Sequence, residues 1–161
     1  MKISYSNSFF SSSHFIVFEN GFCEPIHGHN FRVDVTVDAP LNSAGYTVDF
    51  GVVSQALSKI LQPFRERLLL PGKSDWLSIE RNGAQIEISY QQPDGTPLFW
   101  SIPADHCVIL DVANTTAELI AQTIAQRLWD GLIDEYSLNS VEVRLEETPG
   151  AVAISEVDGR K

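Results

Sequence analysis

Strict alternation of apolar and polar side chains over residues 31–38 is the feature that most limits how this chain can fold. A period of two residues places all the apolar side chains on one face of a β-strand. Such a strand buries one face and leaves the other accessible, which is typical of antiparallel sheets covered on one side. Residues 140–145 alternate in the same way, and residues 2–10 and 151–157 are also strand-like.

Two segments instead carry the 3.6-residue period of amphipathic helices. The first is expected to begin after Asp49, a favourable N-cap residue, and to end before Pro63. The second is expected to open at Thr115 or Thr116 and to end near Gly131.

A β-rich insert is expected between these helices, at about residues 73–105. The strand-like segments of this part of the chain are residues 77–81, 85–90, 98–102 and, after the insert, 107–110. Asn82-Gly83 and Pro93-Asp94-Gly95 have the composition of hairpin turns. A further short strand is expected at residues 46–48, just before the first helix.

The order of these elements predicts an α+β fold, with an antiparallel β-sheet and two helices on one face. A chain of 161 residues is expected to form a single domain over residues 1–161. The net charge of −10 argues against nucleic acid or an anionic membrane as a partner. A phosphorylated substrate remains compatible with this charge, because a bound metal ion can reverse the local field.

Cysteine usage and the lack of long apolar runs indicate the compartment. Cys23 and Cys107 are the two cysteines, too few for a disulfide framework, and they suit a reducing cytoplasm. No charged and apolar leader opens the sequence, and no apolar run approaches the length of a membrane span. We therefore expect a cytoplasmic protein.

Three of the four histidines lie near the N-terminus. His27 and His29 are two residues apart, so their imidazoles point to the same face of an extended strand. His14 closes the preceding apolar run and comes alongside them if the two runs pair. Three imidazoles with an open fourth position are the ligand set of a catalytic zinc ion. Cys23, four residues before the pair, is a candidate thiolate.

Several short motifs together resemble the 6-pyruvoyl-tetrahydropterin synthase and 6-carboxy-tetrahydropterin synthase family. The motifs occur in family order and span most of the chain outside the insert. They are Phe10-Ser11-x-x-His14, Cys23-x-x-x-His27-Gly28-His29-Asn30, Val48-Asp49-Phe50-Gly51, Asn114-Thr115-Thr116-Ala117-Glu118 and Glu147-Thr148.

The resemblance implies the tunnelling fold, assembled as a homohexamer of two stacked trimeric barrels with active sites between subunits. It implies a lyase that acts on 7,8-dihydroneopterin triphosphate, eliminating triphosphate and rearranging the side chain to the 6-pyruvoyl or 6-carboxy product. Such products belong to the biosynthesis of queuosine, tetrahydrobiopterin or folate.

The resemblance also implies roles for individual residues. The histidines His14, His27 and His29 correspond to the zinc ligands, and Cys23 corresponds to the thiol that moves protons. Glu147 corresponds to the carboxylate that holds the pterin ring. Thr115 and Thr116 correspond to neighbours of the pterin pocket. A carboxylate suits this role, because the pterin edge offers two parallel N–H donors in fork geometry.

One family feature is absent. Family enzymes carry an Asp-His pair after the first helix that tunes the cysteine, but residues 63–72 contain no such pair. Asp105-His106, at the end of the insert, is a candidate replacement in the catalytic proton relay, and the alternative is an exposed loop pair.

Structural explanations stand beside the other functional assignments. Cys23 is explained equally by simple burial, since cysteine is a small apolar residue. Thr115 and Glu118 have the spacing of a helix capping box. Glu147 follows Glu146, and paired acids at a strand end are usually solvated.

The missing Asp-His pair leaves two further functions open. One is an enzyme on the same scaffold that cleaves the dihydroneopterin side chain to 6-hydroxymethyl-dihydropterin. The other is a non-catalytic protein that binds a pterin or purine through zinc and Glu147.

Overall fold

The computed structural model describes residues 1–159, and the contacts within the chain group them into two compact units. The first unit contains Met1–Phe10, Asn30–Pro63 and, of the described residues, 117–159. The second contains Ser11–His29 and Phe64–Thr116. The two longest strands run from one unit into the other. The expectation of a single domain stays a prediction.

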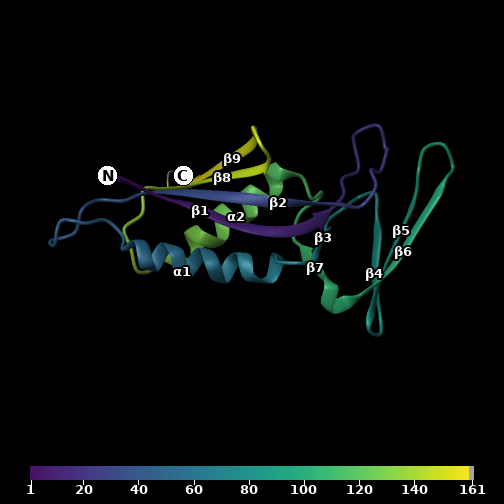
Figure 1. Cartoon of the computed structure of the whole chain (residues 1–161), viewed down its shortest axis with the longest axis horizontal. Helices are drawn as coiled ribbons and strands as arrows, with labels where there is room; N and C mark the ends of the chain where they lie inside the picture. The colour runs from purple at the N-terminus through teal and green to yellow at the C-terminus, as the bar shows by residue number, and fades with distance from the viewer. Residues whose placement is uncertain (160–161) are drawn as a thin grey trace. The chain divides into compact units, whose positions relative to one another are not determined.

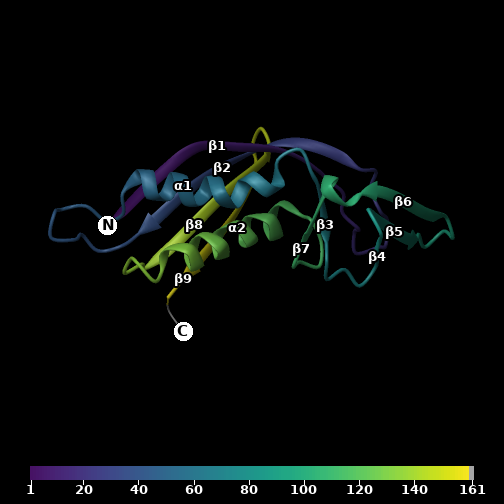
Figure 2. The same cartoon turned by 90° about the horizontal axis from the view of Figure 1, so that it is seen from below.

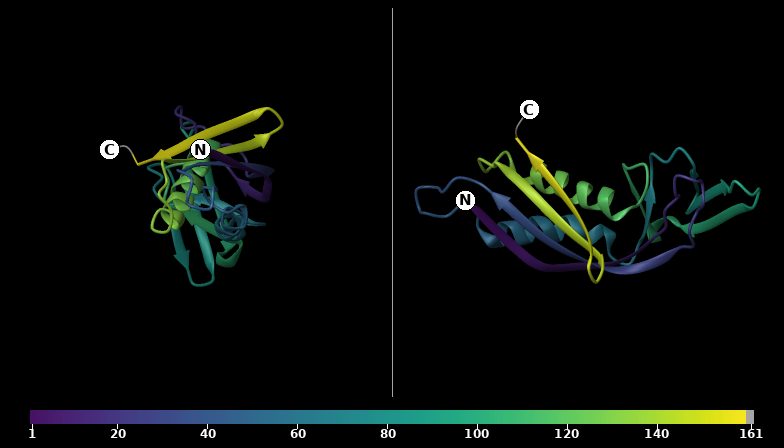
Figure 3. Two further views of the ribbon diagram at one scale, coloured as in Figure 1. Left: turned by 90° about the vertical axis from the view of Figure 1, so that its left-hand side faces the viewer. Right: turned by 90° about the horizontal axis from the view of Figure 1, so that it is seen from above.

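Four neighbouring strands form the sheet of the first unit (Figure 1). In sheet order they are β1 (Lys2–His14), β2 (His27–Asp38), β8 (Ser140–Thr148) and β9 (Ala151–Asp158). β8 pairs antiparallel with both of its neighbours, β2 and β9. Figure 3 shows β8 and β9 as one hairpin at the end of this order.

Two helices, α1 (Phe50–Leu61) and α2 (Ala117–Leu132), lie on the same face of these strands (Figure 2). α2 packs against β8, β9 and α1, and it buries an apolar stripe that includes Ile120, Ile124 and Leu128. Asp49 caps α1 as predicted, because its carboxylate accepts a hydrogen bond of 2.7 Å from the Gly51 amide. α1 ends at Leu61, before Pro63 as expected, and a single turn of 3-10 helix, η1 (Gln62–Phe64), follows it.

The second unit departs from the expected antiparallel arrangement. β3 (Leu68–Pro71) pairs parallel with the end of β1, where Ser13 lies opposite Leu68. β7 (Cys107–Leu110) pairs parallel with β3. The sheet is therefore mixed, and the purely antiparallel expectation is corrected at these two strands.

The insert forms a separate three-stranded antiparallel sheet of β4 (Ser78–Asn82), β5 (Gln85–Gln91) and β6 (Pro97–Pro103). Both predicted turns are present, with Gly83 and Gly95 at positive φ. One 3-10 turn, η2 (Ala104–His106), joins β6 to β7. The insert strands pack on a buried apolar cluster that includes Phe15, Val17 and Leu70.

One local expectation was wrong, and one strand was not expected. Residues 46–48 do not form a strand: residues 47–48 are bends, in a segment that precedes the Asp49 cap. Residues 68–70, which had no expected structure, form most of β3 and are buried on both faces, so they lack the alternation that marks a half-buried strand.

None of the helices described in residues 1–159 is long and apolar enough to cross a lipid bilayer.

Candidate functional site

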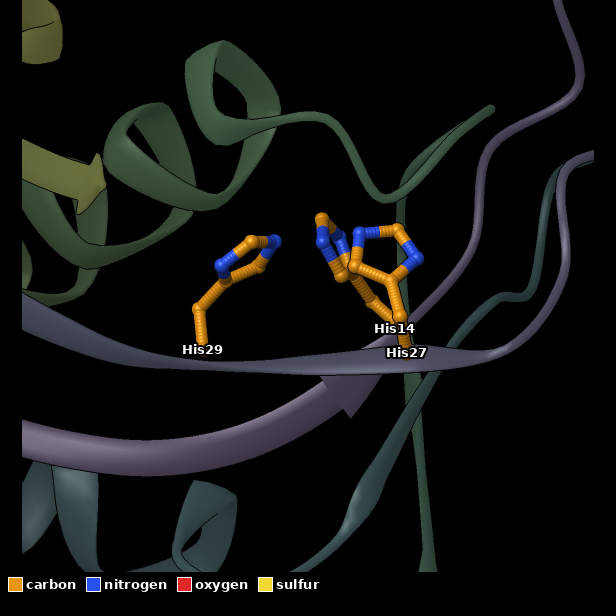
Figure 4. A group of neighbouring side chains, drawn as sticks. All are labelled: His14, His27 and His29. Atoms are coloured by element: carbon orange, nitrogen blue, oxygen red, sulfur yellow. The ribbon is translucent and has the colours of Figure 1, made fainter.

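Three histidines converge where β1 ends and β2 begins (Figure 4). His14 is the last residue of β1, while His27 and His29 occupy the start of β2, on the same face because they are two residues apart. The ring centroids lie 4.7 to 5.3 Å from one another. We call these residues the histidine triad.

Hydrogen bonds fix which ring nitrogen of two of these histidines is available. Nδ1 of His14 lies 2.7 Å from the Thr115 carbonyl oxygen, and Nδ1 of His27 lies 3.0 Å from the Pro25 carbonyl oxygen. A carbonyl only accepts, so each Nδ1 carries the proton that it donates. The Nε2 atom of each ring then presents a lone pair, which is the form of histidine that binds a metal.

The histidine triad fits a metal ion. Its candidate ligand atoms all lie within 4.8 Å of one another, and the group combines buried His14 with two half-buried partners. Three imidazoles match a site with three protein ligands and one open position. In two of them, His14 and His27, the Nδ1 atom is bonded to a backbone carbonyl, as is usual for histidines that bind a metal through Nε2. Within residues 1–159, Cys23 is not part of this group.

His14 is also held by the segment that precedes α2. Thr115 is fully buried, and its hydroxyl donates a 2.7 Å hydrogen bond to the Phe15 carbonyl oxygen. The Asn114 side chain donates to the Val17 carbonyl oxygen at 2.8 Å and accepts from the Val17 amide at 3.4 Å. The predicted capping role of Thr115 is replaced by this contact, since α2 begins only at Ala117.

Cys23 lies in the loop between β1 and β2, and its side chain is buried in the apolar cluster of the second unit. Its Sγ lies 3.6 Å from the Glu24 carbonyl oxygen, and its amide donates to the Gln92 side chain at 3.3 Å. Burial raises the pKa of the Cys23 thiol, and the nearby Glu24 carboxylate raises it further. The protein alone therefore disfavours the Cys23 thiolate.

Glu24 was not among the predicted site residues. Its Oε1 accepts a 2.9 Å hydrogen bond from the Ile16 amide and lies 3.8 Å from Nδ1 of His27. Its position three residues before His27 is the sequence signal that could have identified it.

The remaining predicted residues lie elsewhere. Thr116 directly precedes α2, and Glu147 is a half-buried residue of β8 in the first unit. Asp105 and His106 are exposed on η2. Burial and the Asp105 charge raise the pKa of Cys107, which is half-buried and packs against the apolar cluster. The catalytic role of Asp105 and His106 stays a prediction, as do the substrate contacts of Thr115, Thr116 and Glu147.

Comparison with known sequences identifies relatives along nearly the whole chain. The sequence model of the family described as 6-pyruvoyl tetrahydropterin synthase matches residues 3–157. A protein of Pyrococcus horikoshii with the provisional name 6-carboxy-5,6,7,8-tetrahydropterin synthase is 29% identical over 150 residues, covering 89% of this chain and 83% of that protein. A protein of Methanocaldococcus jannaschii with the same provisional name is 29% identical over 146 residues, covering 88% and 85%.

Solved structures with a similar fold carry the same family name as the matching sequence model. The 6-pyruvoyl tetrahydropterin synthase of Plasmodium vivax superposes with a TM-score of 0.85 at 25% identity, covering 98% of both chains. The Plasmodium falciparum enzyme gives a TM-score of 0.85 at 26% identity, with 98% of both chains covered. Two further Plasmodium vivax structures are variants in which a glutamate, described as a catalytic residue, is replaced by alanine or by cysteine.

Proposed function

Because the chain belongs to the 6-pyruvoyl tetrahydropterin synthase family of enzymes, we propose that it is a zinc-dependent lyase acting on 7,8-dihydroneopterin triphosphate. The product would be the 6-pyruvoyl or the 6-carboxy tetrahydropterin, and the names of the archaeal relatives favour the 6-carboxy product. The observation that carries the proposal is the convergence of three metal-competent imidazoles on the fold of this family.

His14, His27 and His29 are the residues that would hold the metal. Zinc suits a set of three neutral imidazoles, and when bound it would polarise a side-chain oxygen of the substrate and so acidify the adjacent C–H bond. The proposed part of Glu147 is to accept two N–H groups from the pterin edge, which fixes the ring and aims its side chain.

Proton transfer is the step for which this chain offers two candidate bases. Cys23 is the residue that the resemblance implies, but its pKa is raised by burial and by Glu24. The Glu24 carboxylate is the second candidate, because its Oε1 lies 3.8 Å from Nδ1 of His27. Asp105 and His106, exposed on η2, are retained as a proposed relay for the thiol.

The Glu24 position supports a second candidate function, in which the enzyme cleaves the side chain to 6-hydroxymethyl-dihydropterin. A Plasmodium vivax relative has a glutamate described as catalytic, for which a variant with cysteine also exists. Cys23 and Glu24 are adjacent in this chain, so both chemical types of base are available to it. In the cleavage, Glu24 would accept the proton of a side-chain hydroxyl, the first step of an aldol-type cleavage.

Turnover tests both functions. The purified, zinc-loaded chain is incubated with 7,8-dihydroneopterin triphosphate, and the pterin products are identified by mass spectrometry. If the chain is the proposed lyase, triphosphate is released and the 6-pyruvoyl or 6-carboxy product forms, and this product is lost in Cys23→Ala. If the chain instead cleaves the side chain, the product is 6-hydroxymethyl-dihydropterin. This product is then lost in Glu24→Gln but still formed by Cys23→Ala. Substrate that binds and stays unchanged overturns both and leaves the non-catalytic pterin-binding protein.

We also propose a cytoplasmic homohexamer of two trimers, following the family resemblance. Light scattering coupled to size-exclusion chromatography would give six times the 17.9 kDa chain mass if this is right. A monomer or a dimer would contradict it.

A further inference from the structure

We propose that Asn114 and Thr115 are positioning residues that fix His14 for metal binding, rather than residues that contact the substrate. We call them the anchor pair. This inference rests on the proposed metal site, and it assigns Thr115 a role different from the one implied by the family resemblance.

Thr115 contacts His14 directly. The Thr115 carbonyl oxygen accepts the Nδ1–H of His14 at 2.7 Å, a short and well-formed hydrogen bond between residues 101 positions apart. This bond selects the tautomer with the lone pair on Nε2 and also sets the rotation of the ring. An outer-shell carbonyl of this kind orients a ligand histidine and increases its basicity.

The Thr115 carbonyl is itself held in place. The Thr115 hydroxyl donates to the Phe15 carbonyl oxygen at 2.7 Å, and the Thr115 amide donates to the Asn114 side chain at 3.1 Å. Thr115 thus contacts two consecutive residues of the other segment, the ring of His14 and the backbone of Phe15. A shift of the carbonyl would break the hydroxyl bond as well.

Asn114 holds the backbone that follows His14. The Asn114 side chain bonds to both the amide and the carbonyl of Val17. β1 has already ended at His14, so strand pairing along β1 does not hold Val17. The anchor pair therefore adds hydrogen bonds to the backbone just beyond the ligand residue, at a position that also forms an isolated antiparallel bridge with Cys23.

The burial of Thr115 decides between positioning and substrate binding. The residue has 0% relative exposure, and its hydroxyl hydrogen is already donated to Phe15. A substrate contact through this hydroxyl would require breaking a buried hydrogen bond, which is costly. Positioning of His14 requires no change of structure.

Four variants test the proposal through zinc affinity, measured by competition with a chromophoric chelator. Thr115→Val removes the hydroxyl but keeps a β-branched side chain, and Thr115→Ser keeps the hydroxyl. Asn114→Asp keeps the acceptor but loses the donor to Val17. The matched control is Thr123→Val on α2, which also loses a 2.8 Å hydroxyl-to-carbonyl bond, to Leu119.

Thr115→Val and Asn114→Asp are expected to lower zinc affinity on the order of tenfold or more, the usual effect of losing an outer-shell partner. Thr115→Ser should stay within about threefold of the unsubstituted protein, as should Thr123→Val. The visible spectrum of the cobalt-substituted protein should change in Thr115→Val and not in Thr123→Val. A folded Thr115→Val with unchanged affinity and spectrum overturns the proposal.

A metal-free measurement keeps the proposal separate from the proposed function. In chelator-treated protein, NMR should detect a slowly exchanging Nδ1 proton of His14, and Thr115→Val should lose this protection. Absence of the protected proton in the unsubstituted protein overturns the positioning role. Failure of the unsubstituted protein to bind zinc overturns the proposed function instead, while this NMR signal still decides on the positioning role.

Discussion

The histidine triad and the loop that carries Cys23 are supported in different ways, although both belong to the second unit. His14 is held by the anchor pair through hydrogen bonds of 2.7 to 3.1 Å that are centred on the fully buried Thr115. The loop of residues 18–24, here the Cys23 loop, instead contacts the insert, through a Tyr90 hydroxyl bond to the Gly21 carbonyl at 2.7 Å and a longer Gln92 contact to Cys23.

This difference suggests a division of tasks. The proposed metal ligands lie at strand ends, and the Thr115 carbonyl that holds His14 is itself fixed by two hydrogen bonds. Their geometry is therefore preorganised, as a metal site requires. The candidate bases Cys23 and Glu24 lie on a loop that forms hydrogen bonds with Tyr90 and Gln92 of the insert, and Glu24 is also bonded to Ile16. Changes in the insert should therefore alter proton transfer while leaving the metal in place.

The largest expected difference in zinc affinity between variants of the histidine triad and variants of the Cys23 loop comes from removing a proposed ligand. His29→Ala should lower zinc affinity by more than about a hundredfold, because a ligand contributes more than the outer-shell partners that cost 10–100-fold. Cys23→Ala should leave zinc affinity within about threefold. His106→Ala is the matched control for metal content, since this exposed histidine lies outside the triad. A comparable loss of zinc in Cys23→Ala would show that loop and triad are one site.

Gly21→Ala should distort the Cys23 loop. Gly21 has φ +81, and a Cβ placed there would lie 2.6 Å from Cγ of Pro93, so the loop must move. We expect a loss of about 1–3 kcal/mol in the free energy of unfolding, and a fall in turnover with zinc affinity unchanged. Gly45→Ala is the control, because it has φ +86 with nothing within 4 Å. Equal effects of the two substitutions on turnover would contradict the role of the Pro93 contact.

Tyr90→Phe should have a smaller effect on the same loop. It removes only the hydrogen bond to Gly21, worth about 1 kcal/mol of unfolding free energy in chemical denaturation. We expect turnover to fall several-fold and zinc affinity to stay the same. Tyr46→Phe, at an exposed tyrosine, should change neither quantity. Full turnover in Tyr90→Phe would show that the insert does not position the bases.

The smallest expected effect is a change of pH dependence at Cys23. Because burial and Glu24 raise the pKa of Cys23, its alkylation in metal-free Cys107→Ser protein should become fast only above the pH typical of a free thiol. Glu24→Gln removes one raising charge, so its alkylation profile should move to lower pH. The folded thiol holds its proton more tightly than the unfolded one, so its contribution to stability is lost as pH rises through the folded pKa. An unchanged profile in Glu24→Gln would contradict this account.

Much of the architecture followed from local patterns. The alternation over residues 31–38 and the Asp49 cap depend on neighbours in the sequence, and both are confirmed. β3 escaped prediction because its residues 68–70 are buried on both faces and carry no period. The parallel pairing of β3 with the end of β1 depends on distant partners, so no local pattern could reveal it.

In the candidate site, too, some features could be predicted from the sequence and others depend on distant contacts. The convergence of His14, His27 and His29 was predictable because two lie on one strand and the third ends the preceding run. The anchor pair was not predictable, because its contacts join residues about 100 positions apart, such as Thr115 and Phe15. The sequence spacing favoured a capping role for Thr115, and the structure shows that its hydroxyl bonds elsewhere.

The central claim is that the histidine triad holds a zinc ion with an open fourth position and that Cys23 belongs to a separate loop. X-ray absorption spectroscopy of the zinc-loaded protein tests it directly. The account predicts three imidazole nitrogens and an oxygen at about 2.0 Å, with no sulfur neighbour. A sulfur scatterer at about 2.3 Å would contradict it, because Cys23 would then close the coordination shell and the site would be structural.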